Sequence, residues 1–422
     1  MKMIGKSFPA KKTIVLVILS VAGGLLAVVN FFLLSKDMLR GDYSAKDIFP
    51  QPMYGFFRVP DRPNTIAQNG VNRLAGDYAQ VYFPSLEFSS LTQNYETGYL
   101  DPWKRPSRYA PFIHYVCALS FCKLDYGYAS LLHMLTQMVL FYAFFIAAFK
   151  ILEIESDLWV GLLITTLLLF VTPAGLSWFE RGQFSLYVAL AYLLLMLGLI
   201  KNKPVFVFIS ALFAYVKWTS FPFLFVVLFV HWMSAKNTKE RAQYTQSALI
   251  YLLVILVLSL AFRSRFIHFL EGIYKQEVNV EAVGIALAQL LPTSLVKGMP
   301  ILLILLGYLS LRKNNMDFER AAPFLIGSGI LMLTYPTVAF EYNIPNLFCF
   351  IPLIFYWARN PKLMNHAAKY VFFIFISLAS CTAFLGSTVG AKTILFGYMA
   401  VAGFFLILPF IDNKTFGNAL KG

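Results

Sequence analysis

The chain has 422 residues, of which 59% are hydrophobic and only 13% are charged, and its formal net charge is +14. This composition excludes an ordinary soluble protein, because a folded chain of this size could not hide so much apolar surface from water. It also argues against a nucleic-acid partner, since the lysines and arginines lie in short loops between apolar runs, as in membrane proteins.

About thirteen apolar runs follow one another along the chain. Several are shorter than the roughly 20 residues that a straight transmembrane helix needs, so we expect some to be tilted, bent or re-entrant. The runs are 13–34, 109–122, 126–149, 158–176, 184–200, 204–216, 220–233, 247–262, 299–311, 321–333, 345–357, 370–386 and 391–411. We therefore expect an all-α polytopic membrane protein, with a single domain over residues 1–422.

Residues 13–34 form the first predicted transmembrane helix. A cleaved signal peptide is the alternative, but this run is longer than a typical signal core and no small-residue cleavage site follows it. The hydrophilic segment 35–108 is then a long first extracytoplasmic loop, expected to carry interfacial helices.

Basic short loops mark the cytoplasmic side and set the remaining topology. The first loop and Glu180 are both predicted to be extracytoplasmic. An even number of membrane crossings must therefore separate them, yet three apolar runs lie between them. The shortest, residues 109–122, carries His114 and is expected to be re-entrant or peripheral, which leaves about twelve transmembrane helices. The loop 263–297, with its apolar stretch 282–291, has the pattern of an interfacial amphipathic helix.

Two candidate elements combine acidic and basic side chains. Gly76-Asp77-Tyr78 in the first loop offers a carboxylate as proton acceptor, and Arg105 and Arg108 offer guanidinium groups suited to phosphate. A solvated loop with an ordinary Gly-Asp turn is the alternative. Glu180-Arg181-Gly182-Gln183 is predicted to open a helix that ends at Ile200, where it either pairs its own charges or presents backbone N–H groups to an anion.

Two further elements lie later in the chain. Lys217 stands between apolar runs and precedes Pro222, which predicts a break that turns the lysine toward a cavity rather than toward the lipid surface. Glu341 and Tyr342 lie between two prolines in a predicted outer loop. The glutamate there either bonds loop amides or orients an acceptor hydroxyl.

The cysteines and histidines show no metal-ligand spacing. Cys117, Cys122, Cys349 and Cys381 are interpreted as packing or lipid-facing residues, with no disulfide framework implied. The five histidines are interpreted as packing or interfacial residues.

In this order, the elements resemble glycosyltransferase family 87, a branch of the C-type membrane glycosyltransferases. The similar motifs are a Gly-Asp-aromatic triplet with a following tyrosine, a Tyr-Pro-Pro motif, a Gly-Gln pair, a lysine before a proline, and a late Ser-Pro-x-x-Trp-x-x motif. Here these are Gly76, Asp77, Tyr78 and Tyr82; Tyr109-Ala110-Pro111, with the first proline replaced; Gly182-Gln183; Lys217 with Pro222; and Tyr335-Pro336 to Glu341-Tyr342, where Tyr335 and Phe340 depart from the motif.

The resemblance implies a C-type fold and transfer of a sugar, often mannose, from a polyprenyl phosphate to a lipid or glycan hydroxyl on the extracytoplasmic face, with inversion. Asp77 is the expected general base. Cations for the donor phosphate are expected to be Lys217, Arg105, Arg108 and Arg181. Expected substrate-binding residues are Tyr82, Tyr109, Glu180, Gln183, Glu341 and Tyr342. No nucleotide-binding loop or Asp-x-Asp motif is visible, so we expect no metal or other cofactor.

Two other functional classes remain open from the sequence. A transporter or flippase of an anionic or lipid-linked solute would use a similar basic cavity, although no repeat relates the two halves of the chain. A polymerase or ligase of surface polysaccharide would usually carry its long loop later in the chain.

Overall fold

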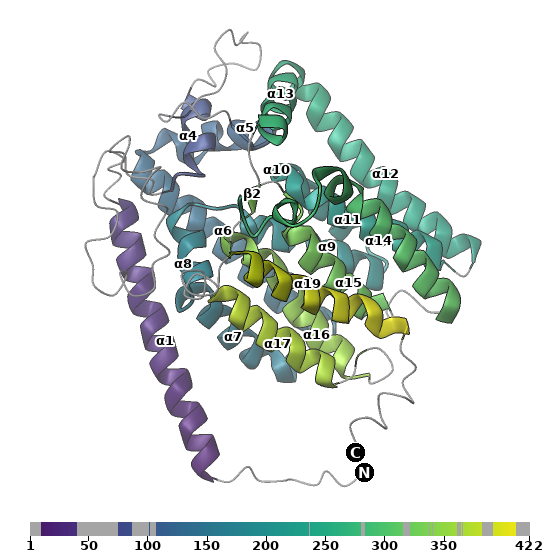
Figure 1. The fold of residues 1–422 in the computed structure, drawn as a ribbon. Helices are drawn as coiled ribbons and strands as arrows, with labels where there is room; N and C mark the ends of the chain where they lie inside the picture. The colour runs from purple at the N-terminus through teal and green to yellow at the C-terminus, as the bar shows by residue number, and fades with distance from the viewer. Residues whose placement is uncertain are drawn as a thin grey trace.

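The computed structural model describes residues 10–39, 75–86, 101, 107–235, 237–279, 283–314, 321–336, 338–339, 341–360, 364, 366–381 and 391–410. Over these ranges the chain is helical, and one pair of two-residue strands is its only sheet (Figure 1). The expected all-α class is therefore confirmed.

Several helices are long and apolar enough to cross a membrane. In the described ranges there are four: Val17–Lys36 within α1 (Ala10–Leu39), α6 (Tyr126–Ile151), α12 (Thr238–Ala261), and Lys392–Phe410, which joins α19 (Ala391–Ile407) to η7 (Leu408–Phe410). The predicted first helix, 13–34, lies inside α1. Other apolar helices have only 10–17 residues. The number of about twelve spans therefore stays a prediction.

The core is built around α9 (Ser185–Ile200). It is buried on every side from Ser185 to Leu199, because its sequence is apolar around the whole helix. α10 (Pro204–Val216), α6 and the 3₁₀ segment η6 (Glu341–Cys349) pack against it. α15 (Ala322–Leu333) is equally buried. Further elements of the bundle are η1 (Phe121–Lys123), η2 (Glu155–Asp157), η3 (Trp218–Ser220), α11 (Phe221–Ser234), α14 (Thr293–Asn314), α16 (Phe350–Ala358) and α17 (His366–Ser380).

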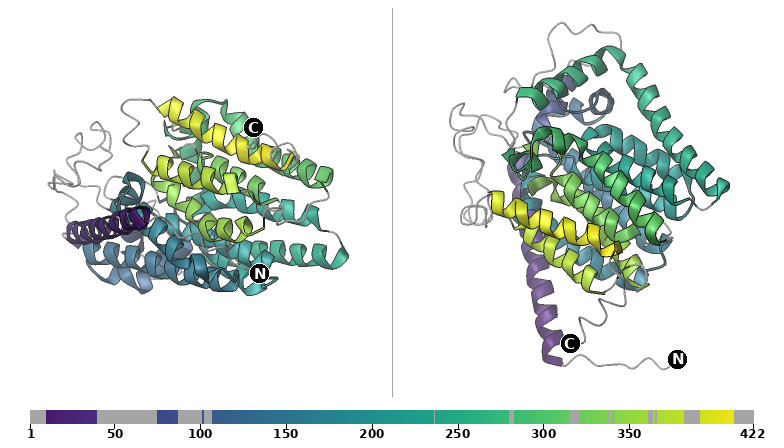
Figure 2. Two further views of the ribbon diagram at one scale, coloured as in Figure 1. Left: turned by 90° about the horizontal axis from the view of Figure 1, so that it is seen from below. Right: turned by 45° about the vertical axis from the view of Figure 1, so that its right-hand side comes forward.

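Apolar side chains also cover the outside of the bundle. α1 and α12 lie along two flanks of the molecule (Figures 1 and 2). Leu253 and Leu260 of α12 are about 60% exposed, and leucines of α14 are exposed as well. Continuous apolar patches of this kind are rare on soluble proteins, and a lipid environment accounts for them.

The apolar run 158–176 is bent rather than straight. α7 (Leu158–Phe170) and α8 (Pro173–Glu180) meet at 67°. Pro173 occupies the first turn of α8, and the Thr172 side chain accepts a hydrogen bond from the Gly175 N–H. The predicted helix opening at Glu180 is wrong, because α8 ends there and α9 begins only at Ser185.

Three helices lie together at one end of the bundle: α4 (Ala79–Leu86), α5 (Pro111–Leu119) and α13 (Arg263–Asn279) (Figure 1). With nine residues, α5 is about 13 Å long and too short to cross a membrane by itself. That residues 109–122 are re-entrant or peripheral stays a prediction.

The predicted interfacial helix of the loop 263–297 corresponds to α13, and the apolar stretch 282–291 is not part of it. That stretch instead contains β1 (Val283–Gly284) and η4 (Leu287–Gln289). β1 pairs in parallel with β2 (Val338–Ala339), which fixes the segment after α13 beside the chain entering η6.

Candidate active site

Two turns that lie far apart in the sequence hold the predicted catalytic carboxylate. The Ala75 N–H donates to the Glu180 carbonyl at 2.7 Å, and the Asp77 N–H donates to the Arg181 carbonyl at 2.9 Å. Gly182 has φ +63°, and a Cβ there would lie 2.8 Å from the Cβ of Tyr78. Both the backbone conformation and the close approach require glycine. The Gly182-Gln183 pair is therefore part of the backbone structure that positions Asp77.

The Asp77 carboxylate is buried, with 7% of the residue exposed, and several donors surround it. Arg181 Nε lies 3.1 Å from Oδ2, and Gln183 Nε2 donates to the same oxygen. Gln80 Nε2 approaches Oδ1 at 3.4 Å. A guanidinium and amide donors stabilise an ionised carboxylate, so Asp77 is held without a proton of its own.

Lys217 lies in a break between α10 and η3, as its position before Pro222 predicted. Its ammonium donates to Gln183 Oε1 at 2.9 Å and to Asn343 Oδ1 at 3.0 Å. Gln183 therefore bridges the carboxylate of Asp77 and the ammonium of Lys217 with the two ends of one amide. Because a carboxylate only accepts and an ammonium only donates, this pairing fixes the orientation of the amide.

A second amide holds the bridge in place. Gln137 Nε2 donates to the backbone carbonyl of Gln183 at 2.8 Å and lies 2.9 Å from His133 Nε2. The His133 ring packs against Tyr78 and Phe184, with ring centroids 4.5 Å and 4.4 Å apart. His133 is thus a packing residue, as expected.

Burial lowers the pKa of Lys217 from its ordinary value to about 8, because the ammonium loses hydration. The negative charge of Asp77 opposes this shift. A substrate anion in contact with the ammonium would act in the same direction as Asp77.

These side chains face a cavity of about 480 Å³. Its charged lining residues are Asp77, Arg108, Lys217 and Lys297, so cations outnumber the single carboxylate. Its uncharged polar lining residues include Gln80, Gln183, Asn343 and Asn346, while Trp218, Ile273 and Val296 are among the apolar ones. Such a cavity suits an anion with an attached polar group and an apolar tail.

Six of the predicted site residues line this cavity: Asp77, Arg108, Tyr109, Gln183, Lys217 and Tyr342. Arg181 lies behind Asp77, with its guanidinium carbon 4.8 Å from the centroid of the Tyr342 ring.

The other predicted residues are not brought to the cavity by the described part of the chain. The Tyr82 hydroxyl donates to the Leu124 carbonyl at 2.9 Å, and Glu180 contributes its backbone carbonyl to the turn pair. Arg105 and the side chain of Glu341 lie outside what the structure describes.

Of the two alternatives for this element, the one in which Gly182 and Gln183 present backbone N–H groups to an anion is excluded. Their N–H groups donate to the carbonyls of Phe179 and Trp178, both at 3.1 Å, and close the end of α8. The side chain of Gln183, rather than its backbone N–H, reaches the site.

Several lining residues were missing from the sequence-based set: Gln80, Asn343, Asn346 and Lys297. Gln80 stands three residues after Asp77, and the turn that leads from Asp77 into α4 brings the two side chains to 3.4 Å of each other. Asn343 directly follows the predicted Tyr342. No local pattern distinguishes Asn346 or Lys297, since their position depends on how η6 and α14 pack.

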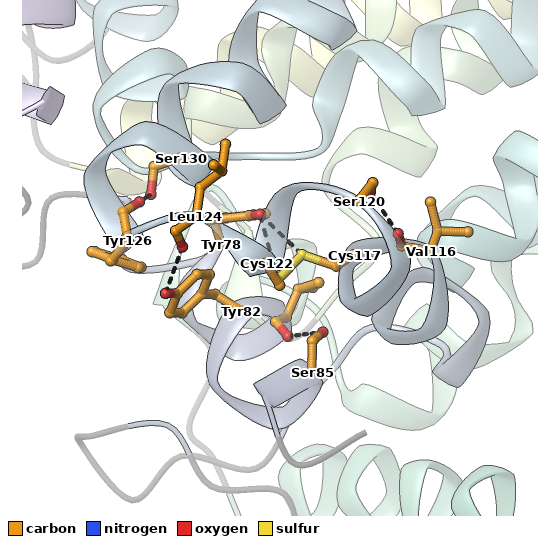
Figure 3. The surroundings of a disulfide bond; sticks show 11 residues. Tyr78, Tyr82, Ser85, Val116, Cys117, Ser120, Cys122, Leu124, Tyr126 and Ser130 are labelled. Carbon is orange, nitrogen blue, oxygen red and sulfur yellow. Dashed lines mark hydrogen bonds between the residues drawn. A yellow bond between two sulfur atoms is a disulfide. The ribbon is translucent and has the colours of Figure 1, made fainter. Parts of the chain in front are cut away.

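A disulfide joins Cys117 at the end of α5 to Cys122 in η1, contrary to the expectation from the sequence (Figure 3). α5 ends with its C-cap at Ser120, η1 follows directly, and the two Cα atoms lie 5.1 Å apart. The Tyr78 hydroxyl lies 3.0 Å from Cys117 Sγ. The disulfide therefore contacts Tyr78, the residue next to Asp77 in the same turn.

Among the described residues, no group of three or more His, Cys, Asp or Glu side chains is arranged to hold a metal ion. In comparisons with known proteins, the chain matches no family model, no curated protein and no solved structure.

Proposed function

We propose that this protein is a membrane glycosyltransferase that transfers a sugar from a polyprenyl phosphate to an acceptor hydroxyl. The observation that carries the proposal is the bridge from Asp77 through Gln183 to Lys217 at the wall of one cavity. It holds a proton acceptor and a phosphate-binding cation on either side of a single amide. Displacement of phosphate by an alcohol needs both groups at once.

In the proposed reaction, the acceptor oxygen attacks the anomeric carbon while the bond from that carbon to the phosphate oxygen breaks. The hydroxyl proton passes to Asp77, and the polyprenyl phosphate leaves with the bonding electrons. Lys217 and Arg108 balance the negative charge on the phosphate, and Arg181 holds Asp77 in place. Attack from the face opposite the phosphate gives inversion.

The surroundings of the cavity support a lipid-linked donor. Apolar side chains such as Ile273 and Val296 line part of it, and lipid-compatible helices surround the bundle. We propose that the cavity lies on the extracytoplasmic side of the cell membrane. The Cys117–Cys122 disulfide supports this side, since disulfides persist in oxidising compartments.

Membership of glycosyltransferase family 87 remains part of the proposal. In its favour, three motifs of the resemblance meet in one place although they are far apart in the chain: Gly76-Asp77, Gly182-Gln183 and Lys217. The tyrosine of the first motif, Tyr82, points to the Leu124 carbonyl and gives it no support. Mannose is the first sugar to test.

The test is incubation of the purified protein in lipid nanodiscs with radiolabelled polyprenyl-phosphate mannose and membrane lipids. The proposal expects a new labelled glycolipid or glycan and release of polyprenyl phosphate. In parallel, the protein in sealed vesicles is given the same donor. Movement of the donor across the bilayer without covalent transfer would reject the enzyme in favour of a flippase.

A further inference from the structure

Two amide oxygens in the cavity residues have no hydrogen-bond partner. They are Gln80 Oε1 and Asn346 Oδ1, and their residues are 2% and 8% exposed. Both residues line the cavity, Gln80 from α4 and Asn346 from η6. A buried acceptor without a partner costs free energy, so such atoms in residues that line a cavity point to a ligand that donates to them.

The orientation of the Gln80 amide follows from its neighbour. Its Nε2 approaches Asp77 Oδ1 at 3.4 Å, and the Asp77 carboxylate also accepts from Arg181 and Gln183. An ionised carboxylate has no proton to give, so the amide must turn its N–H group toward Asp77. The oxygen is then the end of Gln80 that is left without a partner.

An amide oxygen accepts hydrogen bonds only, which restricts the ligand group that it recognises. An ionised phosphate has no donor to offer, and a prenyl chain has none. A sugar ring carries several hydroxyl groups that donate. The cations of the same cavity, Lys217, Arg108 and Lys297, match the phosphate instead.

We propose that Gln80 and Asn346 form a hydroxyl-binding subsite that recognises the hexosyl head group of the donor, separately from the phosphate. The inference rests on the proposed function and specifies which residues set the preference for a glycosylated lipid. Gln80 links the two roles, because the amide that accepts from the sugar also donates to the proposed base.

The test compares binding of three probes to protein in nanodiscs: polyprenyl phosphate, polyprenyl-phosphate mannose and polyprenyl-phosphate glucose. The wild type is expected to bind at least one hexosyl lipid about tenfold more tightly than polyprenyl phosphate. Asn346→Leu, of similar size without an acceptor, is expected to remove that advantage and leave polyprenyl phosphate binding unchanged. Asn346→Asp, which keeps an acceptor oxygen, should retain more of it.

Gln80→Met is the second variant and provides the answer if Asn346→Leu does not fold. Lys217→Met is the contrasting variant, expected to weaken all three probes. Equal binding of the three probes by the wild type would overturn the subsite, as would unchanged hexosyl preference in the variants that fold.

The outcome separates the subsite from the enzyme. Amide-dependent preference for a hexosyl lipid without any transferred label would keep the subsite and reject the glycosyltransferase. Sugar transfer that does not depend on Gln80 or Asn346 would keep the glycosyltransferase and reject the subsite.

Discussion

α12 and the pair α10–α11 are both apolar helical stretches, yet only one of them takes part in the candidate site. α12 continues unbroken for 24 residues and exposes leucines along its outer face. The α10–α11 stretch is interrupted at Lys217, whose ammonium reaches Gln183 and Asn343. An unbroken helix satisfies its own backbone hydrogen bonds and offers lipid an apolar surface, whereas a break allows a charged side chain to face a cavity.

The comparison assigns function to the side chains that meet at the break, where Gln183 links Lys217 to Asp77. The variant with the largest expected effect is Asp77→Asn, which keeps the shape of the side chain and removes its ability to take a proton. Transfer is expected to fall by about 10²–10⁴-fold, the usual contribution of a general base. Labelled product from purified protein measures it. Asp42→Asn is the matched control, because Asp42 stands in the same Gly-Asp-Tyr triplet. Wild-type turnover in Asp77→Asn would remove the residue from the reaction.

Lys217→Met tests the role of the charged side chain at the break between α10 and α11. Loss of the ammonium is expected to weaken binding of polyprenyl phosphate by about 10²-fold, because a charge-assisted bond to the phosphate is lost. Lys203→Met is the control, since Lys203 is exposed at the opposite end of α10. Equal affinities in the two variants would place the phosphate elsewhere.

Gln183→Met tests the bridge and is expected to slow transfer by about 10–100-fold, because both Asp77 and Lys217 lose a positioning partner. Gln243→Met on α12 is the matched change outside the site. A positioning role also predicts an altered pH profile, since the partner of the Lys217 ammonium changes. An unchanged profile with unchanged turnover would show that the bridge is not used.

A smaller effect is expected from pH. With a pKa of about 8, the Lys217 ammonium loses its proton as pH rises from 7 to 9, so donor affinity should fall by up to about tenfold over this range. Stability should change in the opposite direction. The unfolded chain keeps the proton up to about pH 10.4, and it therefore binds more protons than the folded one between the two pKa values. Lys217→Met should show neither dependence, and a fall in affinity that persists in this variant would assign the titration to another group.

The smallest effect on activity is expected from replacing both Cys117 and Cys122 with serine. The closed loop is short, so unfolding should become easier by about 2 kcal/mol, with turnover changed less than about threefold. Thermal unfolding and activity measure the two effects, and Cys381→Ser is the control. Activity lost at a temperature where the protein stays folded would mean that the bond positions Asp77 directly.

The helical class, the first helix and the break at Lys217 could be predicted because each depends on neighbouring residues. Apolar runs define helices, and Pro222 close to Lys217 marks an interruption. The bend between α7 and α8 was missed, although Thr172-Pro173 is its local signal.

The bridge could not be predicted from local patterns. Gln183 lies 106 residues after Asp77 and 34 before Lys217, so their contact depends on how α4, α9 and α10 pack. The same reason hides the pairing of β1 with β2 and the place of Asn346. Sequence patterns indicated which side chains are chemically suited to the site, and tertiary packing decided which of them meet.

The most direct measurement is an electron cryomicroscopy structure of the inactive Asp77→Asn variant in nanodiscs with polyprenyl-phosphate mannose. We expect the donor phosphate in contact with Lys217 and Arg108, and the hexose between that phosphate and residue 77. A phosphate bound outside this cavity, or a hexose remote from residue 77, would contradict it.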